Sequence, residues 1–339
     1  MKYRLLVKSR QGSILILALW SLGLLTVFAL SIGMRVQQKI VLVSRIERRT
    51  QVYDAAEAGI RQAIAFLKSQ TADPKAILKT VLFNSPAFFK EIKLGKAVWD
   101  VSYMSYDGED YSQRIYGIVD EERKININTC DRTTLENLLT EVSGLSDDAR
   151  KDLVNAIIDW RESGESQSEG FLSDEYYGNL KFPYKEKKSN FETLDELLLV
   201  KGITPALYRQ ILSFITVYGS GKVNINTAPR PVLKALGISE SLATAILFLR
   251  RGPDGREATA DDLLFPSESE APMMHILAAA VEPQETQFMR DLYAQNKIGM
   301  ESSHYLVQSR GYANNMKEKR DLICVFDINS GKIKYWREY

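Results

Sequence analysis

A long uncharged stretch is the first pattern in the chain. No charged side chain occurs from Gln11 to Met34, a run of 24 residues. A helix rises about 1.5 Å per residue, so roughly 20 apolar residues cross the hydrocarbon core of a bilayer. Residues 13–34 are therefore long enough to span a membrane as a helix. The basic residues that precede this stretch favour a cytoplasmic N-terminus.

Helical periodicity continues beyond that stretch. No proline occurs from Arg35 to Lys68, and Gly59 is the only glycine there. The apolar residues at helical spacings are Val36, Ile40, Val43, Ile46, Ala56, Ile60, Ile64 and Leu67. Because no helix breaker separates the two segments, the pattern predicts one helix over residues 13–68, about 80 Å long.

Two alternatives arise from the same residues. The first is a membrane anchor followed by a separate juxtamembrane helix. The second is a cleaved secretory signal, with Ala29 and Ser31 as the small residues of its cleavage site. The apolar run is longer than that of an ordinary signal, and the helical pattern continues past Ser31. The continuous, retained helix is therefore favoured.

Alternating patterns on either side of a central helical region predict a sheet. The predicted strands are residues 97–105, 113–119, 304–312, 319–327 and 332–336. The sequence Asn329-Ser330-Gly331 between the last two strands is typical of a hairpin. The sequence thus predicts an α+β fold. Its antiparallel sheet is interrupted in sequence by a large α-helical insertion and is continuous in space.

The helical insertion contains an internal repeat. Residues 124–129 return as residues 222–227, and the ungapped match extends to Leu138 and Leu236. A second matched pair, after a length difference, is Arg161 and Arg250. This pattern predicts two copies of one helical unit. The threonines of the two copies, Thr129 and Thr227, are predicted to be helix N-caps, and the asparagines, Asn126 and Asn224, to stabilise turns.

Charge is distributed unevenly, although the net charge is only +1. Residues 1–68 hold 11 lysines and arginines against 3 acidic residues, whereas residues 128–300 hold 18 against 26. Proteins that bind nucleic acid usually present a basic face. The acidic distal region therefore argues against nucleic acid as a partner.

The sequence contains no recognisable catalytic arrangement. His275 and His304 are the only histidines, and neither stands beside a nucleophile motif. No glycine-rich phosphate loop or zinc-ligand spacing occurs, so the sequence predicts a protein that is not an enzyme. Cys130 and Cys324 form either one disulfide of a secreted domain or two small buried apolar side chains.

One acidic segment is a candidate metal site. The carboxylates Asp159, Glu162, Glu165, Glu169, Asp174 and Glu175 lie within 17 residues. Calcium prefers six to eight oxygen ligands, which a flexible loop of carboxylates and carbonyls supplies. The candidate ligands are Asp159, Glu162, Glu165, Asp174 and Glu175, and the alternative is a solvated acidic loop.

The start of the chain resembles the prepilin-type signal of type IV pilins and type II secretion pseudopilins. A short basic segment ends at Gly12, and the apolar run begins at Ser13. The resemblance implies cleavage between Gly12 and Ser13 by a prepilin peptidase, with the apolar helix kept. Most of these proteins have Glu at the fifth mature position, where this chain has Leu17. The subclass that usually lacks this Glu is the GspK-like minor pseudopilins.

The order of elements over nearly the whole chain also resembles GspK-like proteins. The resemblance implies a leader (1–12), an N-terminal membrane-spanning and amphipathic helix (13–68), a pilin-like α+β domain (69–127 and 300–339) and an inserted α-helical domain (128–299). It implies a minor subunit at the tip of the type II secretion pseudopilus and calcium in the insertion. The expected partners are the other minor pseudopilins, the major pseudopilin, the prepilin peptidase and the assembly platform. The expected location is the inner membrane, with a periplasmic body.

The repeat is also similar to the helix-hairpin-helix modules of competence DNA receptors, and a membrane-anchored DNA receptor is the alternative function. In those modules a Gly-hydrophobic-Gly hairpin lets backbone amides approach phosphate. Here the second glycine is replaced by Ser146, Thr204 and Ser239. These side chains suit the N-cap of the following helix, so the sequence favours a structural role for the hairpins.

Overall fold

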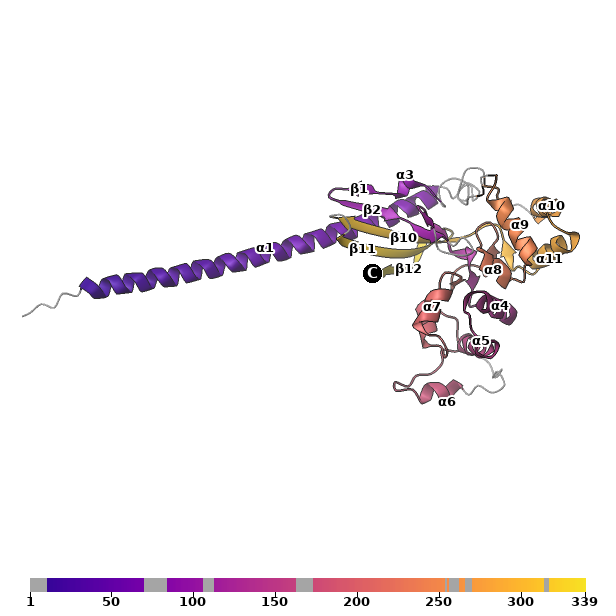
Figure 1. Ribbon diagram of the computed structural model, residues 1–339, viewed down its shortest axis with the longest axis horizontal. Coiled ribbons are helices and arrows are strands. Elements are labelled where there is room, and N and C mark those ends of the chain that lie inside the picture. Colours follow the sequence, from indigo (N-terminus) through magenta and orange to yellow (C-terminus); the bar gives the residue numbers. More distant parts are fainter. Residues whose placement is uncertain are drawn as a thin grey trace, which may run out of the picture.

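The computed structural model describes residues 11–69, 84–105, 113–162, 173–253, 255, 262–265, 270–313 and 317–339. Helix α1 (Gln11–Ser69) is continuous over 59 residues, which confirms the prediction of a single long helix. Its apolar N-terminal part projects away from the rest of the molecule as a stalk (Figure 1). It is the one described helix that is long and apolar enough to cross a membrane.

The C-terminal part of α1 packs on one face of an antiparallel sheet. The strands lie in the order β1 (Ile92–Leu94), β2 (Ala97–Val101), β10 (His304–Ala313), β11 (Glu318–Asp327) and β12 (Lys332–Glu338). β5 (Val119–Asp120) also pairs with β10, and the short helix α3 (Pro86–Phe89) precedes β1. Because β2 and β5 precede the helical region and β10 follows it, the sheet is continuous across the insertion, as predicted.

Small residues bring α1 close to the sheet. Ala55, Ala56 and Ala63 on α1 are fully buried against sheet residues that include Trp99 and Val307. A Cβ added at Gly59 would meet Trp99 at 2.9 Å, so the glycine leaves room for the indole ring. Small residues thus let the backbones of α1 and the sheet approach closely, and Ile60 and Leu67 add larger buried side chains to the same interface.

Two predicted strands are each divided into two. Residues 97–105 form β2 and β3 (Tyr103–Ser105), and residues 113–119 form β4 (Gln113–Ile115) and β5. The division has a physical cause, because β2 and β5 pair with β10 whereas β3 and β4 pair with each other. Ser102 marks the change, since its backbone N–H still bonds to Gln308 while the next residue pairs with Ile115.

The region between β5 and β10 forms a helical unit, residues 125–300, at the end of the sheet away from the stalk (Figure 1). Its helices are α4 (Arg132–Val142), α5 (Asp147–Arg161), α6 (Ser173–Gly178), α7 (Pro205–Ile211), α8 (Arg230–Ala235), α9 (Glu240–Arg250), α10 (Glu270–Ala278) and α11 (Pro283–Ala294). The 3-10 helix η1 (Glu121–Arg123) precedes the unit, and η2 (Leu194–Leu199) lies within it. Two parallel strand pairs complete the unit, namely β6 (Ile125–Asn126) with β7 (Ile215–Thr216) and β8 (Val223–Asn224) with β9 (Ile298–Gly299).

The two repeat copies adopt the same local structure. The Asn126 carboxamide oxygen accepts from the backbone N–H of Asn128 at 2.9 Å, and Asn224 accepts from Asn226 at 3.0 Å. Asn128 then exchanges two hydrogen bonds with the backbone of Phe191, and Asn226 bonds in the same way to Phe265. These contacts confirm that the asparagines stabilise turns.

A buried arginine completes each copy. Arg161 donates to the carbonyls of Ile127 and Cys130, and Arg250 donates to those of Ile225 and Ala228. Each arginine comes from the last turn of the second helix of its copy and satisfies carbonyls in the turn that opens the copy. The matched arginines in the sequence therefore mark a shared structural contact.

The predicted caps are partly right. Thr204 and Ser239 accept hydrogen bonds as N-caps of α7 and α9, and Ser146 takes the N-cap position of α5, each after a glycine with positive φ. The prediction for Thr129 and Thr227 is wrong, because α4 is capped by Asp131 and α8 begins after Pro229. The threonines lie too early to reach the first free N–H groups of these helices.

The two cysteines are free. Cys324 is buried under α1 in the core of the sheet, whereas Cys130 packs against the core of the helical unit. Of the two readings of these residues, the structure supports small buried side chains.

The tightest contact between α1 and the sheet predicts a stability effect. A Cβ at Gly311 would overlap the backbone of α1 at Val52 and Ala56, which cannot move aside as a flexible side chain can. Gly311→Ala should therefore lower the free energy of unfolding by about 1–3 kcal/mol. Gly178→Ala is the control, because no atom lies within 4 Å of its added Cβ. Thermal denaturation of both variants measures the difference, and equal melting temperatures would contradict the proposed close contact.

Candidate functional site

The chain passes between the sheet and the helical unit at two neighbouring places, and a buried carboxylate joins them. Asp120 ends β5, and its Oδ2 atom accepts hydrogen bonds from Asn224 at 2.9 Å, Thr227 at 2.5 Å and Ser302 at 2.8 Å. Its Oδ1 atom accepts from the backbone of Glu122 at 2.8 Å. One side chain thus connects the end of β5, the second repeat copy and the segment that leads back into β10.

Glu122 forms a second connection two residues later. Its Oε1 atom accepts from the backbone N–H of Ser303 at 2.8 Å and from the Ser303 hydroxyl at 2.6 Å. His304 lies between Glu122 and Asp327, with N–O distances of 3.4 and 3.8 Å. Glu122 on η1 therefore fixes the start of β10, the central strand of the sheet.

The electrostatic environment of these carboxylates differs. Burial raises the pKa of Asp120 to about 6, against the opposing effect of the hydrogen bonds from Thr227 and Ser302. Burial alone would also raise the pKa of Glu122, but hydrogen bonds from His304 and Ser303 bring it below its ordinary value. Bonds from Ser330 and Lys334 likewise outweigh burial and hold the pKa of Asp327 at about 2.

Beside this junction lies a cleft of about 320 Å³ between the sheet and the helical unit. Its floor is the sheet face opposite α1, because Leu306, Ile323 and Val325 alternate with the residues that α1 covers. The helical unit supplies the other wall, which includes Tyr208 and Phe214. The cleft is thus mainly apolar, with aromatic residues around it.

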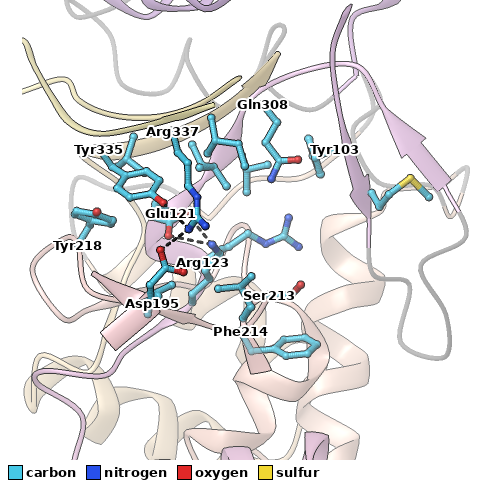
Figure 2. A pocket seen from close by; sticks show the side chains of 18 of the residues that line it. Tyr103, Glu121, Arg123, Asp195, Ser213, Phe214, Tyr218, Gln308, Tyr335 and Arg337 are labelled. Atoms are coloured by element: carbon cyan, nitrogen blue, oxygen red, sulfur yellow. Dashed lines mark hydrogen bonds and ion pairs between the residues drawn. The ribbon is translucent and has the colours of Figure 1, made fainter. Parts of the chain in front are cut away.

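Two charge pairs lie at the edges of this cleft (Figure 2). The buried Lys124 ammonium group bonds to both carboxylate oxygens of Glu121, at 3.0 and 2.8 Å. Arg337 on β12 forms an ion pair with Asp195 on η2, and Tyr208 donates to the same carboxylate at 2.9 Å. Burial and then the Asp195 contact raise the pKa of Tyr208, so this phenol remains a hydrogen-bond donor.

The predicted processing site lies at the start of α1. Gly12 and Ser13 are in the first helical turn, and the side chain of Ser13 lies outside the described set. Cleavage between them stays a prediction.

The predicted calcium ligands are only partly described. Asp159 is buried in the last turn of α5, Glu162 follows that helix and pairs with Arg161, and Glu175 is exposed on α6. Glu165 and the Asp174 side chain lie outside the described residues. Among the residues that are described, no three metal-binding side chains converge, so the calcium site stays a prediction.

Sequence reasoning did not find the junction or the cleft. Asp120, Glu122 and Ser302 stand in no motif, and their contacts join residues about a hundred positions apart or more. The one available signal was the unusual acidic run at 120–122 directly before the first repeat copy. Asp195 and Arg337 are likewise brought together only by the fold.

Comparison with known proteins relates part of this arrangement to a family. Residues 117–220 match the family described as type II secretion system (T2SS), protein K. The matched segment contains the Asp120 crossing and the first repeat copy. The fold is similar to a chain in the crystal structure of the GspK-GspI-GspJ complex from the enterotoxigenic Escherichia coli type 2 secretion system, with a TM-score of 0.61 and 12% identity. These two similarities support a GspK-like minor pseudopilin.

That similarity of fold covers 88% of this chain and 99% of the solved chain. No curated protein matches the sequence. The similarity of fold therefore covers most of this chain, although few residues are identical.

The pKa of Asp120 predicts how stability depends on pH. The folded state holds this proton more tightly than the unfolded state, so the contribution of Asp120 to stability falls as pH rises from about 4 to above 6. Between pH 5 and pH 7 the expected loss from Asp120 is about 1 kcal/mol. Glu122 and Asp327 have lowered pKa values, so their contributions change only at more acidic pH.

Chemical denaturation at pH 5 and pH 7 tests this prediction with Asp120→Asn, which removes the titrating group. The difference in unfolding free energy between the two pH values should shrink in the variant by about the same amount. An unchanged pH difference would mean that Asp120 titrates normally.

Proposed function

We propose that this minor pseudopilin occupies the tip of a type II secretion pseudopilus, where it initiates or caps the filament during protein export across the outer membrane. Its role is structural and not catalytic. The apolar part of α1 is anchored in the inner membrane with the N-terminus in the cytoplasm, and the body is periplasmic. The major pseudopilin, the prepilin peptidase and the assembly platform are its further partners.

The placement of the helical unit carries this proposal. The unit lies beyond the end of the sheet and away from the apolar part of α1 (Figure 1). In a filament whose subunits stack along their N-terminal helices, a subunit placed above this one would meet the helical unit in place of a free docking surface. This arrangement suits the last position of a filament.

Leu17 supports the same position. In related filaments a Glu at this place is expected to pair with the terminal amine of a neighbouring subunit in the membrane, where an unpaired charge is costly. A terminal subunit lacks one such neighbour, and leucine removes the unpaired charge.

The solved complex that contains the similar fold also contains GspI and GspJ. We infer that two other minor pseudopilins are the direct partners of this chain. The DNA-receptor alternative is less favoured, because serine or threonine caps replace the second hairpin glycines.

Deletion of the helical unit tests the tip position. Glu122 and Ser303 are hydrogen-bonded, so residues 125–300 can be replaced by a short Gly/Ser linker that rejoins neighbouring points of the chain. The variant should still insert in the membrane through α1 but should fail to support secretion. Membrane extraction and immunoblotting check that it accumulates. Normal secretion by a stable deletion variant would exclude a capping role for the helical unit.

Processing should yield a mature chain that starts at Ser13. Mass spectrometry of the N-terminal peptide from the native membrane measures this directly. Gly12→Leu should keep the leader attached, whereas Gly23→Ala is a control within the same helix, with open space around its added Cβ. A mature start near Ile32 would indicate an ordinary secretory signal instead.

Calcium bound by the acidic segment should stabilise the folded body. A ligand at a hundredfold excess over its Kd adds about 2.7 kcal/mol. Chelator should therefore lower the melting temperature of the protein, and Asp174→Ala should abolish the difference between chelator and calcium. Asp152→Ala, an exposed aspartate on α5, is the control. A melting temperature that does not respond to chelator would leave the solvated-loop interpretation.

A further inference from the structure

One charged group in the cleft has no partner among the described residues. Arg123 ends η1, and its guanidinium group reaches into the middle of the cleft, with Gln308 above it and Ser213 below it in Figure 2. No described carboxylate forms an ion pair or hydrogen bond with it. The other two cations of the cleft, Lys124 and Arg337, are paired with Glu121 and Asp195.

The direction of Arg123 follows from its neighbours. Glu121 turns toward Lys124, and Glu122 turns toward Ser303. These contacts fix the turn of η1, so the third side chain has the cleft as its remaining direction. The backbone that carries Arg123 is thus held by the hydrogen bonds of Glu122 before any ligand binds.

The surroundings of Arg123 specify a ligand with two parts. A guanidinium group binds a carboxylate through two parallel hydrogen bonds. The sheet face of the cleft, formed by residues such as Leu306 and Val325, and the ring of Phe214 suit an apolar or aromatic side chain. The amide of Gln308 and the hydroxyl of Ser213 are placed to bond to a peptide backbone.

We propose that this cleft binds an extended peptide segment of another protein, through an acidic side chain on Arg123 and a neighbouring apolar or aromatic side chain on the sheet face. The volume of about 320 Å³ accommodates a few residues, at the lower end of small-ligand pockets. The cleft opens on the side of the sheet that α1 does not cover, so packing of α1 does not compete with this ligand. The site is independent of the tip position.

Two blocked dipeptides of equal size test the proposal. Acetyl-Phe-Glu-amide and acetyl-Phe-Gln-amide differ only in the carboxylate, and their Kd values for the full chain in neutral detergent micelles are measured by calorimetry. The Glu peptide should bind at least tenfold more tightly than the Gln peptide. In Arg123→Ala the preference should disappear, and in Arg123→Lys it should be reduced, because lysine lacks the two-pronged geometry.

Lys93→Ala is the matched control, since this exposed lysine lies on β1, at the opposite edge of the sheet. It should leave both Kd values unchanged. Equal binding of the two peptides by the unmodified protein would overturn the proposal, and so would the absence of binding by either. A Glu preference that survives in Arg123→Ala would also overturn it. The two Kd values for the unmodified protein test the preference for a carboxylate even where a variant folds poorly.

Discussion

The buried carboxylate of Asp120 is the contact on which the arrangement of the molecule depends. A sheet whose strands are separated by more than 170 residues of helical structure needs its two crossings to meet at one place. Asp120 brings them together because a single oxygen accepts from Asn224 in the helical unit and from Ser302 at the return. Burying this charge is costly, as its raised pKa indicates, and the four hydrogen bonds offset the cost. The orientation of the helical unit relative to α1 follows from this junction.

The two faces of the sheet differ in what covers them. Small residues on α1 and Gly311 on β10 allow the helix to lie close along one face, which leaves no space there for another partner. The junction holds the helical unit at one end of the other face, so that face is covered only in part. The cleft lies between this face and the helical unit, and Arg123 reaches into it while Glu122 on the same turn bonds to Ser303.

The parts of the fold that local patterns encode could be predicted from the sequence. Apolar periodicity located α1, alternation located the strands, and the repeated asparagines located the two turns. The site could not be predicted in this way. Asp120 and Thr227 are 107 residues apart in the chain, and no local spacing indicates that they meet. Thr227 shows the limit well, since its position suggested a cap whereas its hydroxyl serves the carboxylate of a distant strand.

The repeat explains how such a junction can be built from similar parts. Asn126 and Asn224 hold identical turns through their carboxamide oxygens, but their amide groups differ in partner. In the first copy the amide donates to the carbonyl of Tyr218, within the helical unit, and in the second copy it donates to Asp120. The second copy therefore keeps the turn and uses the spare donor to attach the unit to the sheet. The two copies therefore share one turn, whose asparagine amide remains available as a donor. In the first copy this amide bonds within the helical unit, and in the second copy it bonds to the sheet.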